Sequence, residues 1–253
     1  MAEKRYYTKG MGVEEMGKPF PSLIKIDKEE FVVKHQAPTG YFKEEKEELP
    51  LTFIVIFSGG TVRESDYFYP ILKHRSLFPM LKLEFLADDT FLENKKPRIF
   101  DFARSKQREY LSSTTQDVPD RYFLLTDIDD FGNWVTKETP TCEKLGIRIL
   151  ASNPCFEVWL YYATNSDKFN HFLFPQNRLK LSKTVKTWCG SHVKGGLQPK
   201  KALFKLDANI INAKNNYVYD ENTQYGDLFS SNVFELGEVL QPLLKGKIDA
   251  LYK

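Results

Sequence analysis

The stretch Arg121-Tyr-Phe-Leu-Leu-Thr-Asp-Ile-Asp-Asp130 is an apolar run that ends in alternating acids. Its apolar residues favour β-structure and predict a buried strand over 122–126. On an extended backbone Asp127 and Asp129 would project from one face at the carboxyl end of that strand, roughly 6 to 7 Å apart. Open α/β sheets bind their ligands at this end. A hard divalent cation would relieve the repulsion between the two carboxylates, whereas the alternative is an acidic turn that caps the next helix.

The segments on either side of this strand predict an α/β fold. Strands are expected at 51–57, 81–86, 122–126 and 148–151, and helices at 63–75, 97–111, 139–145 and 156–163. Because strands and helices alternate, the sheet should be mostly parallel with right-handed crossovers. Two further helices are predicted at Ala202–Asn215 and from Val233 to about Gln241, the second capped by Asn232.

The length of 253 residues and the hydrophobic content of 42% allow a substantial core. We expect an irregular N-terminal arm over 1–50, an α/β core over 51–165, and a basic, mainly helical region over 166–253 packed on that core. No apolar run approaches the roughly 20 residues of a membrane span, and the N-terminus lacks the apolar core of a signal peptide. A cytoplasmic location without membrane partners is therefore expected.

Several chemistries are disfavoured by the sequence. The cysteines Cys142, Cys155 and Cys189 have no Cys-x-x-Cys spacing, which indicates neither a disulfide framework nor a zinc site. We expect them to be reduced and Cys155 to be buried. The four histidines have no metal-ligand spacing. Neither a phosphate-binding loop nor a Gly-x-Ser-x-Gly elbow occurs, so the chain carries no evident nucleotide hydrolase site.

The net charge is +2, yet the charges are unevenly distributed. Acids cluster within 27–48, whereas residues 178–214 are rich in Lys and Arg and include the single acid Asp207. Such a stretch can neutralise nucleic-acid phosphates, and nearby aromatic rings can stack on unpaired bases. The candidates for this contact are Lys183, Lys186, Lys194, Lys200 and Lys201. The alternative is a solvated helix face followed by a loop.

Three sequence blocks occur here in an order that resembles a known family. The Asp-x-Asp strand comes first, Leu145-Gly-Ile follows, and Ser152-Asn-Pro-Cys-Phe-Glu-Val-Trp159 comes next. Residues 53–72 add a strand, a glycine turn and a Glu-x-x-Tyr-Phe helix. Over roughly residues 50–215 the chain resembles the RloB-like family, whose members resemble Toprim-fold nucleases of bacterial defence loci. The fold that this implies is a Toprim-like α/β fold.

One position departs from the family pattern. The family usually has Glu-Gly-x-x-Thr-Glu-x-x-Tyr-Phe, whose first glutamate is the Toprim catalytic acid and metal ligand. The matching position here is Gly59, and the second acid is retained as Glu64. Three explanations remain open: a subfamily uses Glu64 with the two aspartates, the chain has lost a metal ligand, or Gly59 is an introduced substitution. Gly59-Gly60 could also form a phosphate-cradling turn.

The resemblance implies an endonuclease that depends on Mg²⁺ or Mn²⁺ and acts in antiviral defence. Asp127 and Asp129 would hold the metal with Glu64 as the third acid, and Glu157 would support the site. The lysines would bind DNA or RNA, a separate ABC-type or AAA-type ATPase would supply ATP hydrolysis, and the chain could form a homo-oligomer. The alternative is a non-catalytic nucleic-acid-binding or ATPase-docking subunit with a degenerate Toprim site.

Overall fold

The computed structural model describes residues 23–27, 30–33, 51–115, 117–168 and 178–252. The chain divides into two compact units, Met1–Glu48 and Leu49–Lys253. In the first unit, β1 (Leu23–Asp27) pairs antiparallel with β2 (Glu30–Val33). The prediction of an irregular arm is wrong for these two segments, because their apolar and β-branched residues form a short ladder.

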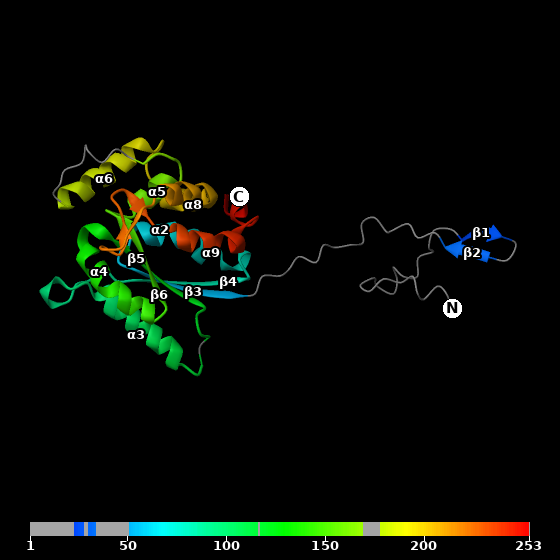
Figure 1. Cartoon of the computed structure of the whole chain (residues 1–253), viewed down its shortest axis with the longest axis horizontal. Helices are drawn as coiled ribbons and strands as arrows, with labels where there is room; N and C mark the ends of the chain where they lie inside the picture. The colour runs from blue at the N-terminus through cyan, green and yellow to red at the C-terminus, as the bar shows by residue number, and fades with distance from the viewer. Residues whose placement is uncertain (1–22, 28–29, 34–50, 116, 169–177, 253) are drawn as a thin grey trace. The chain divides into compact units, whose positions relative to one another are not determined.

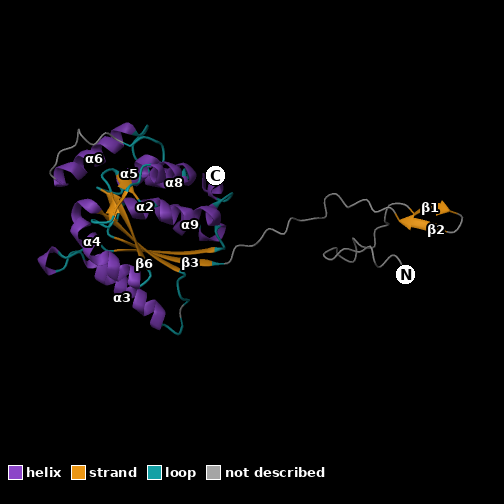
Figure 2. Ribbon diagram, viewed as in Figure 1, coloured by secondary structure: helices purple, strands orange, loops and turns teal. Residues whose placement is uncertain are grey.

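The second unit is built on a five-stranded sheet with the order β4-β3-β5-β6-β9. These strands are β3 (Thr52–Ser58), β4 (Leu81–Ala87), β5 (Arg121–Asp127), β6 (Ile147–Asn153) and β9 (Ser230–Ser231). The first four are parallel, and β9 pairs antiparallel with the end of β6. The predicted α/β fold with a mostly parallel sheet is confirmed, and each of its four predicted strands is present (Figure 2).

Helices cover both faces of this sheet (Figure 1). One face carries α2 (Arg63–Lys73), α5 (Glu157–Tyr162), α6 (Arg178–His192), α7 (Pro199–Leu203), α8 (Leu206–Asn215) and α9 (Phe234–Leu244). The other face carries α3 (Arg98–Ser112) and α4 (Ile128–Lys144). The side chains of β3 alternate between the two cores, with Ile54 and Ile56 in the first and Val55 and Phe57 in the second. The predicted helical C-terminal region is confirmed.

Short elements connect these layers. They are the 3₁₀ turns η2 (Arg75–Leu77), η3 (Glu93–Lys95) and η5 (Ile248–Tyr252), and the two-residue strands β7 (Tyr219–Asp220) and β8 (Tyr225–Gly226). The strands β7 and β8 pair antiparallel. None of these short elements was expected from sequence periodicity, which needs longer windows than they offer.

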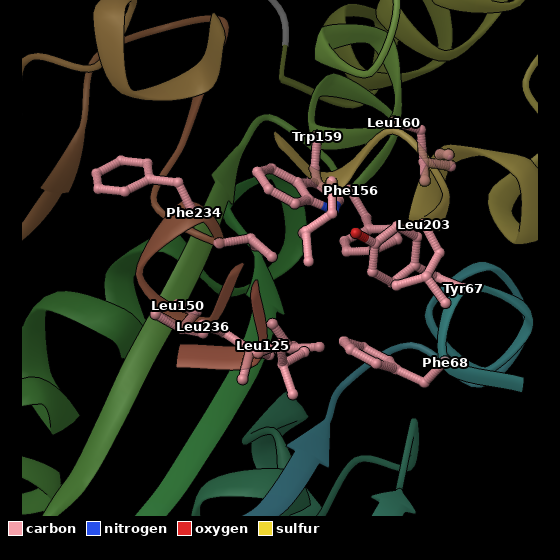
Figure 3. Packing of buried hydrophobic residues seen from close by; sticks show 14 of the residues in the cluster. Tyr67, Phe68, Leu125, Leu150, Phe156, Trp159, Leu160, Leu203, Phe234 and Leu236 are labelled. Atoms are coloured by element: carbon pink, nitrogen blue, oxygen red, sulfur yellow. The ribbon is translucent and has the colours of Figure 1, made fainter. Parts of the chain in front are cut away.

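An aromatic cluster joins α2 to α5 and fixes how these helices approach the sheet. The ring centroid of Tyr67 lies 5.9 Å from that of Phe156 and 6.2 Å from that of Trp159. Figure 3 shows these rings packed together above Leu125 and Leu150 of the sheet. Tyr67 follows Glu64 by one helical turn, and Trp159 follows Glu157 by two residues. Packing of the cluster therefore sets the relative positions of the two glutamates.

Three local predictions are wrong. Helix α4 starts at Ile128 rather than at 139, so Asp129 lies in its first turn and not on an extended strand. Its buried residues recur at helical spacing and pack against the sheet: Ile128, Phe131, Val135, Thr139 and Cys142. The predicted helix over Ala202–Asn215 is two helices, α7 and α8. Asn232 does not cap α9, because its side chain hydrogen-bonds to the backbone of β6.

The cysteines are free and buried, as predicted for Cys155. Burial raises the pKa of the Cys155 thiol well above its ordinary value. Within the described residues, no helix is long and apolar enough to cross a membrane.

Candidate active site

The carboxyl ends of β3 and β5 place two turns side by side at one edge of the sheet. The strands are neighbours, and Ser58 is in register with Leu125. The pairing continues into the first turn, since the Gly59 N–H donates to the Leu125 carbonyl at 2.9 Å. Helix α2 begins four residues after Gly59, and Glu64 lies in its first turn. Glu64 therefore comes to the edge at which β5 ends in Asp127.

Asp127 connects the two motifs that the sequence singled out. It is the last residue of β5 and the N-cap residue of α4, yet its side chain does not cap that helix. Its Oδ1 instead accepts a 2.8 Å hydrogen bond from the Phe156 N–H. The N–H groups of Ile128 and Asp129 both donate to the Pro154 carbonyl at 3.0 Å. Three hydrogen bonds thus hold the Asp-x-Asp segment against the block from Ser152 to Trp159.

A lysine from α6 faces both aspartates. Lys186 Nζ lies 3.9 Å from Oδ2 of Asp127 and 3.7 Å from Oδ2 of Asp129. The Asp129 side chain is 5% exposed and that of Asp127 is 19% exposed, so solvent screens this contact incompletely. The two aspartates do converge, as the sequence predicted. The turn from strand to helix brings them together, rather than an extended backbone.

Two buried glutamates complete the cluster. Glu64 is 7% exposed, and its carboxylate lies directly over Gly60. Glu157 is the first residue of α5, and its Oε1 lies 3.4 Å from Nε of Arg63. Arg63 was not expected from the sequence. The signal that could have indicated it is its position directly before Glu64.

The cluster has more carboxyl groups than cations. Four carboxylates, those of Glu64, Asp127, Asp129 and Glu157, share Lys186 and Arg63 as nearby cations. Burial raises the pKa of Glu64 to about 7, and the charge of Glu157 adds to the effect of burial. Burial also raises the pKa of Asp127, with Glu64 and Asp129 as like charges. A bound divalent cation would favour the ionised form of these carboxyls and would take the place of their protons.

The donor set fits a hard divalent cation in its chemistry. Carboxylate oxygens are the ligands that Mg²⁺ and Mn²⁺ prefer. Among the described residues, however, no three His, Cys, Asp or Glu side chains are arranged so that they could hold a metal ion. Lys186 lies close to both aspartates instead. A metal bound by Asp127, Asp129 and Glu64 would therefore require these side chains to move.

A family model of RloB-like proteins matches residues 54–240, from β3 to α9. The chain belongs to the RloB-like family. The match includes every acid of the cluster, and it confirms the resemblance that the sequence motifs indicated. Comparisons with curated proteins and with solved structures found no match.

In this RloB-like protein the two turn glycines have different surroundings. A Cβ on Gly60 would overlap the Glu64 carboxylate, whereas a Cβ on Gly59 would lie 3.1 Å from Cε2 of Phe131. The φ of Gly59 is outside the left-handed region. Ser58 Oγ accepts from the Gly60 N–H at 3.1 Å, and the Gly59 N–H is bound to Leu125. Both glycine amides are engaged, which disfavours a phosphate-cradling turn.

The five candidate lysines of the RloB-like chain do not form one patch. Lys186 alone of the five contacts the acid cluster. Lys183 is exposed one turn earlier on α6, and Lys200 lies 3.3 Å from Oδ1 of Asp66. Lys194 and Lys201 border a separate cavity near the end of α5. The basic stretch is therefore divided among four surroundings.

Proposed function

We propose that this RloB-like protein is a divalent-metal-dependent endonuclease, a hydrolase that cleaves phosphodiester bonds of nucleic acids. One observation carries the proposal: the two family motifs meet at Asp127, at the sheet edge where Glu64, Asp129, Glu157 and Lys186 gather. Open α/β sheets bind their ligands at this edge. The surplus of carboxylates supports a role for Mg²⁺ or Mn²⁺.

Each residue of the site would have its own role. Asp127 and Asp129 would hold the metal with Glu64, and the bound ion would stabilise charge on the scissile phosphate and activate water. Glu64 is the third acid of the site, and as the alternative to binding the ion it would serve as the general base. Lys186 would neutralise charge on a bound phosphate. Glu157 would act through Arg63, which lies beside Glu64 in the chain.

The biological setting is proposed from the family. The protein would be an effector of bacterial antiphage defence in the cytoplasm, working with a separate ABC-type or AAA-type ATPase. Its partners would be DNA or RNA and a second copy of the chain, without a membrane partner. The exposed lysines on α6 and α7 support the nucleic-acid part of this proposal.

A second function rests on two specific observations. Gly59 stands where the family usually has its catalytic glutamate, and the acids of the described residues do not form a preformed metal site. A chain with a degenerate site would bind nucleic acid or dock an ATPase without cleaving. This non-catalytic subunit is the alternative that the experiment must separate from the nuclease.

The test incubates the full chain with plasmid DNA, single-stranded DNA and total tRNA, in Mg²⁺, Mn²⁺ or EDTA. We expect cleavage of at least one substrate with a metal and none in EDTA. The double variant Asp127→Asn plus Asp129→Asn should abolish cleavage and Mn²⁺ binding measured by calorimetry. Asp130→Asn is the matched control, because Asp130 is exposed on the same helical turn.

Two results would contradict the proposal. Cleavage that persists in EDTA or in the double variant would place the chemistry elsewhere. Binding of nucleic acid without cleavage in either metal would favour the non-catalytic subunit.

A further inference from the structure

A cavity of about 140 Å³ lies at the opposite end of α5 from Glu157. Its apolar wall includes Leu160 and Ala163 at α5, Leu197 of the loop between α6 and α7, and Ala202 of α7. Leu160, Ala163 and Ala202 are buried, so the wall is part of the protein core. The cavity volume is several times the space of about 30 Å³ that one water molecule occupies in the liquid. The cavity is also open to solvent, so it would enclose part of a larger ligand and not only a single water.

Three lysines border this apolar wall: Lys194, Lys201 and Lys205. Among the described residues, no acidic side chain lines the cavity. In the part of the chain that the structure describes, none of the three has a carboxylate within ion-pair distance, unlike their neighbour Lys200, which pairs with Asp66. Three lysines at one cavity with no carboxylate beside them give its border a positive charge, which would attract an anion.

The loop between α6 and α7 is built to bring these lysines together. Gly195 and Gly196 have φ values of +84° and +74°, a backbone conformation that residues with a side chain rarely adopt. The Gly196 N–H donates to the Val193 carbonyl at 2.8 Å, and Gln198 Nε2 donates to the Gly195 carbonyl at 2.9 Å. The chain therefore reverses tightly, so that residues before and after the two glycines line one cavity.

We propose that this cavity binds a nucleoside phosphate, with the phosphate at the three lysines and the nucleoside against the apolar wall. If inorganic phosphate bound alone, the apolar wall would stay in contact with water. If an uncharged ligand bound, the ammonium groups would stay without a counterion. The nucleoside phosphate is either a free nucleotide or one nucleotide of a bound strand. In the second case the inference deepens the proposed function and rests on it, because the six residues of α5 span roughly 9 Å between the cavity and Glu157.

The test titrates the full chain by calorimetry with adenosine monophosphate, inorganic phosphate and a single-stranded hexanucleotide. The triple variant Lys194→Ala, Lys201→Ala and Lys205→Ala removes the cationic border. Its matched control, Lys137→Ala, Lys144→Ala and Lys245→Ala, removes the same charge from exposed positions outside the cavity. Thr164→Trp, at an exposed position of the lining, blocks the cavity without changing its charge. All seven positions are exposed, so these variants should fold.

We expect adenosine monophosphate to bind at least about tenfold more tightly than inorganic phosphate. The lysine triple variant and Thr164→Trp should each weaken adenosine monophosphate or hexanucleotide at least about tenfold, and the control should not. If these variants weaken the binding of adenosine monophosphate alone, the ligand is a free nucleotide. If they weaken the binding of the hexanucleotide, the ligand is one nucleotide of a strand. Asp127→Asn plus Asp129→Asn should leave adenosine monophosphate binding unchanged, which separates this site from the nuclease.

Three results would overturn the proposal. In the first, inorganic phosphate binds as tightly as adenosine monophosphate. In the second, Thr164→Trp leaves the affinity of both nucleotide ligands unchanged. In the third, the control triple variant weakens binding as much as the lysine triple variant.

Discussion

The N–H of Phe156 donates a 2.8 Å hydrogen bond to Oδ1 of Asp127. This contact joins the end of β5 to the start of α5, so the first aspartate of one motif is oriented by the backbone of the other. The contribution of this hydrogen bond to stability can be measured separately from that of the Asp127 charge.

Asp127→Ala should destabilise the protein more than Asp127→Asn. The asparagine side chain keeps an oxygen that accepts the Phe156 N–H, whereas alanine leaves this partly buried donor unpaired. We expect a difference in unfolding free energy of about 1–2 kcal/mol, measured by urea denaturation in EDTA. Equal stability of the two variants would mean that the hydrogen bond does not hold the motifs together.

Lys186→Met should raise the affinity for Mn²⁺ at least roughly tenfold, because the ammonium beside Asp127 and Asp129 competes with a cation. Without metal the same variant should melt at a lower temperature, since the carboxylates lose a nearby counterion. Calorimetry and thermal melts measure the two effects. Lys183→Met, one turn earlier on the same helix, is the control. Unchanged Mn²⁺ affinity in Lys186→Met would show that Lys186 does not occupy the cation position.

Glu64 should make stability depend on pH in EDTA. Burial raises its pKa to about 7 in the folded state, from an ordinary value of 4.5. The folded protein therefore binds the proton more tightly, and this stabilisation is fully present below about pH 4.5 and is lost as pH rises through about 7. Thermal melts between pH 5 and 8 should show a decline that is smaller in Glu64→Gln. Identical slopes would contradict the raised pKa.

The two turn glycines should respond differently to substitution. Gly59→Glu adds a carboxylate without backbone strain, provided that the Phe131 ring shifts by a few tenths of an ångström. We expect it to increase cleavage with Mg²⁺ more than with Mn²⁺, because Mg²⁺ gives up its water reluctantly. Gly60→Ala should displace the Glu64 carboxylate and weaken Mn²⁺ binding. If the chain with Gly59 cleaves well with Mg²⁺ and Gly59→Glu brings no gain, Glu64 already serves as the working acid.

The candidate lysines should contribute unequally to the salt dependence of nucleic-acid binding. Lys183→Ala should lower the slope of log K against log salt by roughly one if this exposed side chain contacts a phosphate. Lys200→Ala should lower it less, because Asp66 already compensates its charge at 3.3 Å. Fluorescence anisotropy of a labelled oligonucleotide between about 50 and 200 mM salt measures both slopes. A larger decrease for Lys200→Ala would reverse this assignment.

The strands were predictable because apolar runs in a parallel sheet are buried on both faces and stand out in the sequence. The start of α4 was not predictable from the sequence, because Asp129, Asp130 and Gly132 are poor helix formers and come directly after a strand. Tertiary packing overrides these propensities, since the buried positions from Ile128 to Cys142 recur on one face. That spacing was the signal available in the sequence.

The acids of the site were predictable, but their cations were not. Asp127, Asp129, Glu64 and Glu157 come from motifs with fixed spacing, which the sequence displays directly. Lys186 belongs to a basic stretch in which no spacing separates it from Lys183 or Lys194. Its contact with the aspartates depends on how α6 lies over the sheet edge, and that is a property of tertiary packing.

The side chain of Asn232 also has a consequence for solubility. Its Oδ1 accepts from the Ala151 N–H at 2.6 Å and its Nδ2 donates to the Ile149 carbonyl at 3.3 Å, as a peptide group of a further strand would. It thereby extends the cover of β6 beyond the two residues that β9 pairs. An uncovered β6 would offer free backbone groups to a neighbouring chain and invite edge-to-edge aggregation. One amide side chain thus covers backbone groups at this edge of the sheet, where the last strand is too short to do so.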